Sequence, residues 1–204
     1  MNALIINGSN RPNGHGVKLA RLAAKGLEAE SIEEIQPTQL HIEPCRGCCR
    51  CLLHEPKDSL YHCPIEDDVD STLQKMLEVD CLIVNAPVYG GGLPGPFKML
   101  VDRMGRLVYF RRMDRPGAPR LPADPRKGYI SIATFAAPRI AYWLFFNTGR
   151  RILKPLGRLL GRGHRLHLSF SETQLREGRL PGHVLAAAER LGRRMRATLA
   201  KYAP

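Results

Sequence analysis

The chain opens on NALIINGSNRPNGHG (residues 2–16), which predicts a strand that runs into a glycine-rich turn. Ala3 to Ile6 is a short apolar run, turn-forming residues follow, and a helical pattern starts at Val17. The backbone N–H groups of such a loop and the positive end of the next helix favour an anion. The spacing matches neither GxGxxG nor a Walker loop. The loop alone therefore leaves a phosphate cradle and an ordinary strand-to-helix connection equally open.

A second segment, Asp80–Arg103, decides between these interpretations. Cys81 to Ala86 is a nearly continuous apolar run, as expected of a parallel strand that is covered on both faces. Pro87-Val-Tyr-Gly-Gly-Gly92 follows the strand, and a helix is predicted from Pro96. Two such loops at the carboxyl ends of parallel strands form the crevice in which an open α/β sheet binds its ligand.

At these residues the chain resembles the flavodoxin-like NADPH-dependent FMN reductase family over most of residues 1–104. The resemblance rests on Gly8-Ser9-x-Arg11, Pro87-Val-Tyr-Gly90 and Lys98-x3-Asp102-Arg103. It implies that the first loop holds the phosphate of FMN and that the second lies along the isoalloxazine ring. By this resemblance, the residues expected around the phosphate are Ser9, Arg11, Asn13, Gly14, His15, Gly16 and Val17. The residues expected beside the ring are Pro87, Val88, Tyr89, Gly90 and Gly91.

Two further features concern the same predicted site. Thr134 ends the fourth predicted strand and would supply a third loop near the flavin. The chain has His15 and Gly16 where members of the family usually carry Asn followed by Ser or Thr. One hydroxyl donor to the phosphate is therefore missing, and backbone amides would have to replace it.

The alternation of element types predicts the fold class. Besides the two strands above, strand patterns occur at 31–36, 127–135 and 165–170, and helical patterns at 17–28, 66–78, 96–103, 138–160 and 181–202. This order is typical of a flavodoxin-like doubly wound five-stranded parallel sheet with helices on both faces. The length of 204 residues favours a single domain over 1–204, with a basic loop excursion at about 107–126.

A cysteine-rich loop, residues 44–64, is the second strong signal. Cys45, Cys48 and Cys51 have the two-residue spacing that surrounds an iron–sulfur cluster, with Cys63 as a fourth ligand. The loop is similar to that of the iron–sulfur flavoproteins, which implies a 4Fe–4S cluster. Free reduced thiols, a redox disulfide and a zinc site formed by these cysteines, alone or with His54 or His62, stay open as alternatives. Cys81, in an apolar run, is expected in the core.

Charge is distributed unevenly along the chain. Residues 1–102 carry a net charge of −5 and residues 103–204 a net charge of +17. A basic run at 150–165, which includes Arg162, lies beside Tyr142-Trp-Leu-Phe-Phe146. This combination predicts a solvated basic face, with a subunit contact or a peripheral membrane contact as alternatives. No motif supports nucleic-acid binding.

Together these features predict an FMN-dependent NAD(P)H oxidoreductase that passes electrons to a quinone, a flavin, a metal ion or a protein. An iron–sulfur flavoprotein electron carrier is the alternative within redox chemistry, and a non-catalytic flavin- or anion-binding protein that docks through its basic half is the alternative of another class. No catalytic residue is predicted, because the flavin carries the chemistry. The resemblance implies a homodimer or homotetramer, and the lack of a secretory pattern predicts a cytoplasmic location.

Overall fold

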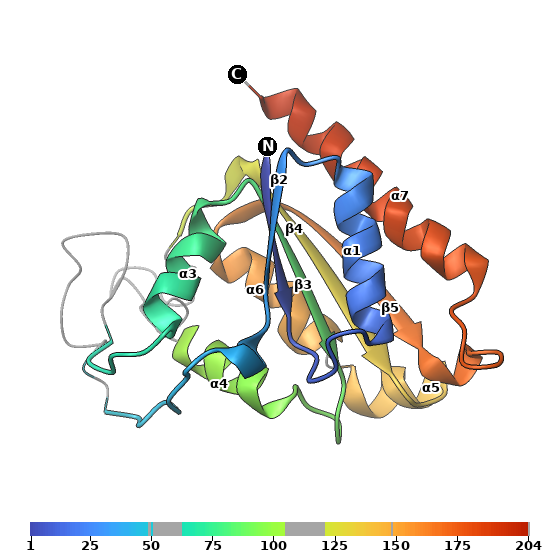
Figure 1. Cartoon of the computed structure of the whole chain (residues 1–204), viewed down its shortest axis with the longest axis horizontal. Helices are drawn as coiled ribbons and strands as arrows, with labels where there is room; N and C mark the ends of the chain where they lie inside the picture. The colour runs from blue at the N-terminus through green and yellow to red at the C-terminus, as the bar shows by residue number, and fades with distance from the viewer. Residues whose placement is uncertain (49, 51–62, 105–120, 148, 204) are drawn as a thin grey trace.

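The computed structural model describes residues 1–48, 50, 63–104, 121–147 and 149–203. Its centre is a five-stranded sheet in the order β2-β1-β3-β4-β5, in which every neighbouring pair is parallel (Figure 1). The strands are β1 (Asn2–Asn7), β2 (Ser31–Ile35), β3 (Cys81–Pro87), β4 (Asp124–Phe135) and β5 (Arg162–Ser171). The predicted flavodoxin-like parallel sheet is thereby confirmed.

Helices cover both faces of the sheet (Figure 1). On one face lie α1 (His15–Leu27) and α7 (Gly182–Leu199), and on the other lie α3 (Val69–Glu78), α4 (Gly95–Arg103) and α6 (Lys154–Leu159). The shorter elements are η1 (Pro37–Gln39), α5 (Arg139–Ala141), η3 (Tyr142–Phe146), η4 (Gly149–Leu153), η5 (Glu172–Gln174) and η6 (Ala200–Tyr202). The result is a three-layer arrangement with the strands' carboxyl ends at the lower edge of the view in Figure 1.

The alternation of side chains along β1 divides the core into two halves. Leu4 and Ile6 face the α3, α4 and α6 layer, whereas Ala3 and Ile5 face α1 and α7. All four are at most 2% exposed, which explains the unbroken apolar run that predicts a strand covered on both faces. The strand β2 lies at the sheet edge and is largely exposed, so it could be read only weakly from its sequence.

The continuous helix predicted over 138–160 is wrong. The chain forms the short α5, a π-helical turn at η3, a second π-helical turn at η4 and finally α6. The break falls at Asn147, which has a φ of 30° and caps η3 in the left-handed region. Asparagine tolerates this conformation better than most residues, so the chain leaves the helical conformation at this residue although the apolar pattern looks uninterrupted.

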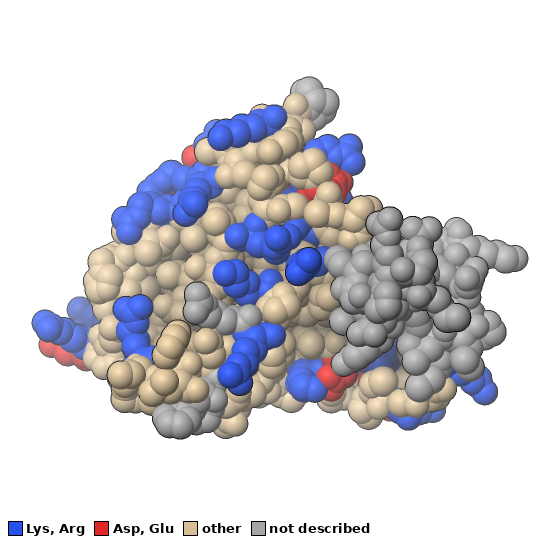
Figure 2. All heavy atoms as spheres, turned by 180° about the vertical axis from the view of Figure 1, so that it is seen from behind, with Lys and Arg blue, Asp and Glu red and all other residues tan. Residues whose placement is uncertain are grey.

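The basic half of the chain is spread over the surface rather than concentrated on one helix. Figure 2 shows the face opposite to that of Figure 1, where Lys and Arg side chains predominate over Asp and Glu. Arg162 does not belong to this surface, because it is fully buried and donates hydrogen bonds to the carbonyl oxygens of Met76 and Val79 at the end of α3. Burial lowers the pKa of Arg162 to about 10, so the guanidinium stays charged at neutral pH.

Two further sequence predictions concern loops. The predicted excursion at 107–126 ends earlier than expected, because β4 begins at Asp124, and its residues 107–120 lie outside the described part. Among the described helices, none is both long and apolar enough to cross a membrane.

Candidate functional site

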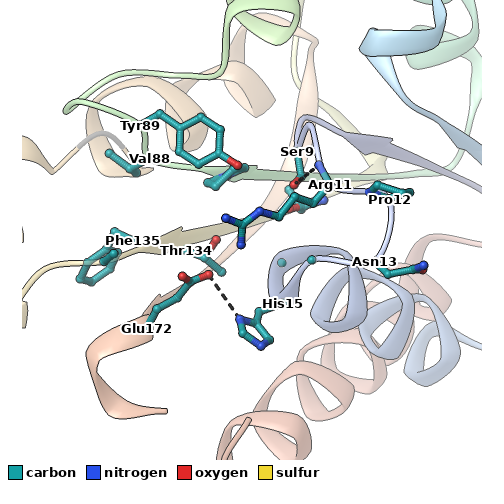
Figure 3. A pocket seen from close by; sticks show the side chains of 15 residues that line it. Ser9, Arg11, Pro12, Asn13, His15, Val88, Tyr89, Thr134, Phe135 and Glu172 are labelled. Carbon is teal, nitrogen blue, oxygen red and sulfur yellow. Dashed lines mark hydrogen bonds and ion pairs between the residues drawn. The ribbon is translucent and has the colours of Figure 1, made fainter. Parts of the chain in front are cut away.

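A cavity of about 490 Å³ lies at the carboxyl edge of the sheet, where the chain leaves β1, β3 and β4 (Figure 3). Its volume is within the range of ordinary small-molecule sites. The described residues that line it are Ser9, Arg11, Pro12, Asn13, Gly14, His15, Gly16, Asn85, Pro87, Val88, Tyr89, Thr134, Phe135, Ala136 and Glu172.

The loop after β1 is held in place by neutral hydrogen bonds. Asn7 Oδ1 accepts from the backbone N–H of Ser9 at 3.1 Å and from Asn85 Nδ2 at 2.9 Å. The backbone N–H of Gly8 donates to the carbonyl oxygen of Asn85 at 2.8 Å. Ser9 Oγ accepts from the backbone N–H of Arg11 at 3.1 Å and keeps its own hydrogen for a ligand. These bonds fix the loop and leave its polar groups directed at the cavity.

Gly16 explains why a hydroxyl residue is absent from this position. A Cβ atom built at Gly16 would overlap the Oδ1 atom of Asn85, whose side chain is fully buried. That Oδ1 atom has no hydrogen-bond partner among the described residues, although an unsatisfied buried acceptor is costly. The missing Cβ therefore lets the start of α1 pack closely against Asn85 at the base of the cavity.

The side chains of Arg11 and Asn13 behave differently. Figure 3 shows the Arg11 side chain extending across the cavity toward Thr134, and the Asn13 side chain pointing away from the other labelled residues. Asn13 Oδ1 accepts a hydrogen bond from Arg21 at 3.4 Å. A cation therefore faces the cavity at position 11, whereas Asn13 offers it only its backbone.

His15, the other departure from the family pattern, connects the start of α1 to a distant loop. Its Nδ1 lies 3.4 Å from Glu172 Oε1, and its Nε2 lies 3.3 Å from the carbonyl oxygen of Gly178 (Figure 3). The contact brings a carboxylate to the wall of the cavity at the N-terminus of α1. His15 thus fixes the position of the Glu172 carboxylate at this wall.

The loop after β3 forms a tight two-residue turn. The backbone groups of Tyr89 and Gly92 exchange two hydrogen bonds at 2.9 and 3.0 Å, and Gly90 and Gly91 between them have φ values of 54° and 82°. Two consecutive positive φ angles favour glycine at both positions. The backbone N–H of Val88 donates to the carbonyl oxygen of Thr134 at 2.7 Å, which joins this loop to the end of β4.

The structure brings together most of the residues that the sequence singled out. All of them line the cavity except Val17, which is a buried residue of α1, and Gly90 and Gly91, which lie at the tip of the turn. The sequence interpretation missed Pro12, Asn85, Phe135, Ala136 and Glu172. Asn85 did carry a signal, because it is the one polar residue in the apolar run of β3.

The two ends of the cysteine-rich segment are joined by a buried ion pair. Arg103 donates to both carboxylate oxygens of Asp67, at 2.7 and 3.2 Å, and to the carbonyl oxygens of Glu43 and Ile65 at 3.0 and 3.4 Å. Both charged side chains are at most 1% exposed. Burial alone would raise the pKa of Asp67, but hydrogen bonds from Arg103 and from backbone N–H groups lower it below its usual value.

The cysteines themselves are only partly described. Cys45 and Cys48 are exposed and Cys63 is half-buried, while Cys51 lies outside the described residues. Within the described ranges, no group of three or more side chains is placed to hold a metal ion. The predicted set Cys45, Cys48, Cys51 and Cys63 therefore stays a prediction. Cys81 is in the core as expected, and burial raises the pKa of its thiol to about 12.

The strand order and the position of the cavity define the class of protein. In the order 2-1-3-4-5, the chain connections reverse direction between β1 and β3, which is where flavodoxin-like proteins hold FMN. The chain belongs to the NADPH-dependent FMN reductase family, whose family model matches residues 1–120. The predicted family is confirmed.

Two curated relatives refine this assignment. An iron–sulfur flavoprotein of Methanocaldococcus jannaschii is 42% identical over 105 residues, which are 50% of this chain and 51% of the relative. The chain thus matches about half the length of that protein. A Bacillus subtilis protein, provisionally named as the NAD(P)H-dependent FMN-containing oxidoreductase YwqN, is 26% identical over 95% of this chain and 98% of the relative.

Solved structures agree on the fold. The NAD(P)H:quinone oxidoreductase from Methanothermobacter marburgensis superposes with a TM-score of 0.66 at 17% sequence identity, covering 95% of this chain and 96% of that one. At this identity the similarity concerns the architecture alone.

Proposed function

We propose that the cavity binds FMN and that the protein is an NAD(P)H-dependent oxidoreductase. When bound, FMN would accept a hydride from NAD(P)H and release electrons to a second acceptor. The observation that carries the proposal is the fit between the cavity and the flavin. A glycine-lined loop, the Ser9 hydroxyl and the Arg11 cation converge at the point where this fold holds FMN (Figure 3).

At the phosphate end, the chain would supply hydrogen-bond donors and positive charge. The helix α1 starts at His15 after Gly14, has no acidic residue in its first turn, and receives no side-chain cap from a described residue. Its first backbone N–H groups would therefore donate to the phosphate, together with the Ser9 hydroxyl and the Arg11 guanidinium. Asn13, Gly14, Gly16 and Val17 would contribute main chain, and His15 would restrain Glu172.

At the ring end, the chain would supply a flat apolar slot and backbone polarity. Pro87, Val88 and Tyr89 line one side of the cavity, and Thr134 and Phe135 line the other. The Tyr89 side chain is 42% exposed, so it can pack on a ring without the loss of contacts in the protein core. The Gly90-Gly91 turn holds Tyr89 in position and lets backbone approach the ring closely.

Absorbance spectroscopy of the purified full chain tests this function. Added FMN should be retained with the wild-type protein, and anaerobic NADPH should bleach its absorbance near the visible flavin bands until air restores it. The double variant Ser9→Ala/Gly14→Val should lose FMN retention, because it removes a donor and places a side chain 3.3 Å from the Ser9 position. Ser71→Ala removes an exposed serine hydroxyl from α3, far from the cavity, and should retain FMN.

The other outcomes of this test identify the alternatives. Flavin that is retained but not bleached by NADPH would favour a non-catalytic flavin-binding protein. Absence of retained flavin in the wild-type protein would contradict the proposed site. Assays with a quinone, free flavin, ferric ion and a redox protein as second acceptor would then identify the acceptor class.

An iron–sulfur flavoprotein is the second candidate, because the cysteine segment is flanked by the Arg103–Asp67 ion pair and relatives that match part of the chain carry that name. Anaerobic purification followed by iron and sulfide analysis tests it. About four of each per chain with broad visible absorbance would support a 4Fe–4S cluster. Zinc, or metal-free thiols, would contradict it.

Two further predictions concern the oligomeric state and the cellular location of the protein. Assembly into a homodimer or homotetramer remains a prediction, which light scattering of the purified chain would test. The cytoplasmic location remains a prediction from the sequence.

A further inference from the structure

A second cavity of about 400 Å³ adjoins the flavin cavity at the β4–β5 edge of the sheet. The residues that line it come from the end of β4, the α5–η3 segment and β5: Phe135, Arg139, Ile140, Tyr142, Trp143, Asn147, His167 and Ser169. Phe135 also lines the first cavity, so the two spaces share a wall. The two cavities are therefore adjacent, with Phe135 between them.

The shared wall is rigid. The ring of Phe135 stacks on that of Tyr142 at 3.6 Å between centroids and 6° between planes. The backbone N–H of Gly149 donates to the Tyr142 hydroxyl at 2.7 Å, and Tyr142 is 5% exposed. The second cavity is therefore a built feature of the fold and not a gap between loose side chains.

One side of this cavity is an open aromatic surface. Trp143 is 61% exposed and its neighbour Ile140 is 71% exposed, although both are large apolar side chains. Exposed tryptophan at a cavity offers a flat face on which a heteroaromatic base can stack. A purine fits this surface better than a flexible aliphatic chain would, because stacking needs a planar partner.

The charge of the cavity is positive. Arg139 is exposed, and its guanidinium makes no ion pair or hydrogen bond with any described residue. No carboxylate occurs among the described residues that line the cavity. On the floor, the two ring nitrogens of His167 lie 2.8 Å from Ser131 Oγ and 2.7 Å from Ser169 Oγ, so its orientation is set.

We propose that this second cavity binds the adenosine end of NADPH, with the adenine on Trp143 and the 2′-phosphate on Arg139. The inference rests on the proposed function, since it takes the nicotinamide end of the hydride donor to lie in the flavin cavity and the adenosine end to lie beyond Phe135. Arginine is well suited to such a phosphate because its planar fork can donate two hydrogen bonds to it. NADH lacks this phosphate, so Arg139 would be the residue that selects NADPH.

A binding measurement tests the site without any redox step. Trp143 is the only tryptophan of the chain, so its fluorescence reports on this cavity alone. Titration of the purified full-length protein with adenosine 2′,5′-bisphosphate should quench it, and 5′-AMP should need at least about a tenfold higher concentration. Arg139→Ala should abolish this difference. Arg190→Ala, which removes an exposed charge from α7, should preserve it.

Kinetics supply the second test. Arg139→Ala should raise KM for NADPH by at least about tenfold and leave KM for NADH within about twofold, with kcat unchanged. Trp143→Ala should raise KM for both dinucleotides, because both carry adenine. Equal quenching by the two nucleotides, or equal KM changes for both donors in Arg139→Ala, would overturn the assignment.

The two tests keep this inference separate from the proposed function. Fluorescence quenching depends on the nucleotide fragment alone and is measured whether or not flavin is bound. If the protein neither retained FMN nor oxidised NADPH but still preferred the 2′-phosphate fragment through Arg139, the proposed function would fail and the nucleotide site would stand. If NADPH bleached the flavin but Arg139→Ala changed neither the fluorescence preference nor the KM for NADPH, the proposed function would stand and the nucleotide site would fail.

Discussion

The loop after β1 and the base of the cysteine-rich segment are both loops at the same edge of the sheet, yet they are stabilised in opposite ways. The first is held by neutral amide and hydroxyl groups and leaves the Ser9 hydroxyl and the Arg11 guanidinium at the cavity (Figure 3). The second is closed by a buried ion pair that backbone groups surround on several sides. A loop with groups left open is suited to receive a ligand, whereas a loop whose charges are matched internally is suited to hold the chain.

The largest expected effect on stability lies at the ion pair. Arg103→Met should lower the free energy of unfolding by about 3–5 kcal/mol, because it leaves the Asp67 carboxylate buried without its partner. Lys98→Met is the matched control, since it removes the exposed Lys98–Asp102 pair from the same helix and should cost at most about 1 kcal/mol. Urea denaturation of both variants measures the difference, and equal losses would refute the contrast.

The acid dependence of stability is the next effect. Because the pKa of Asp67 is lower in the folded protein than in the unfolded chain, its contribution is complete above about pH 4 and is lost as the pH falls through the folded-state value. Wild-type protein should therefore lose stability in acid by about 1.4 kcal/mol for each unit of that pKa difference. Asp67→Asn should lack this component, so the two stability curves should converge at low pH.

A smaller loss of stability, with a large loss of flavin, is expected at Gly16. Gly16→Ala should cost about 1–3 kcal/mol, because the new Cβ overlaps Asn85 Oδ1, and should also weaken FMN binding. Gly182→Ala provides the control at the start of α7, where a Cβ meets nothing within 4 Å and should change stability by less than about 1 kcal/mol. Thermal denaturation and FMN titration give the two readouts.

The smallest effect on stability is expected at Tyr89. Tyr89→Ala should change the free energy of unfolding by no more than about 0.5 kcal/mol, because the side chain is largely outside the core, but it should weaken FMN binding and turnover. Tyr202→Ala removes a tyrosine of similar exposure, 43%, from η6 near His164 and should leave FMN binding unchanged. If Tyr89→Ala instead unfolds the protein, Tyr89 serves the core and its placement beside the ring is wrong.

The sequence predicted what local patterns determine. Apolar runs such as Cys81–Ala86 identified the strands, and the Gly90-Gly91 pair identified the turn, because both depend on neighbouring residues alone. From the sequence alone, the site could be predicted only as the set of loops that follow those strands. Glu172 was missed because its contact with His15 spans 157 positions and exists only once β5 and α7 are in place.

The errors have the same origin. The predicted helix over 138–160 fails at Asn147, where a single left-handed residue outweighs a helical pattern on both sides. Arg162 follows the spacing of its basic neighbours and was read with them, but its position at the start of β5 carries it into the interior. Neither outcome is visible without the packing that surrounds the residue.

The buried guanidinium of Arg162 also sets a lower limit on how much of the chain forms a stable unit. The family match ends at residue 120, before β4 begins. A protein cut at that point would expose the apolar flank of β3 and leave the terminal carbonyl groups of α3 without the side chain that binds them. The recognisable half of this molecule therefore depends on the less recognisable half to fold, and shortened versions for crystallisation or expression should keep both.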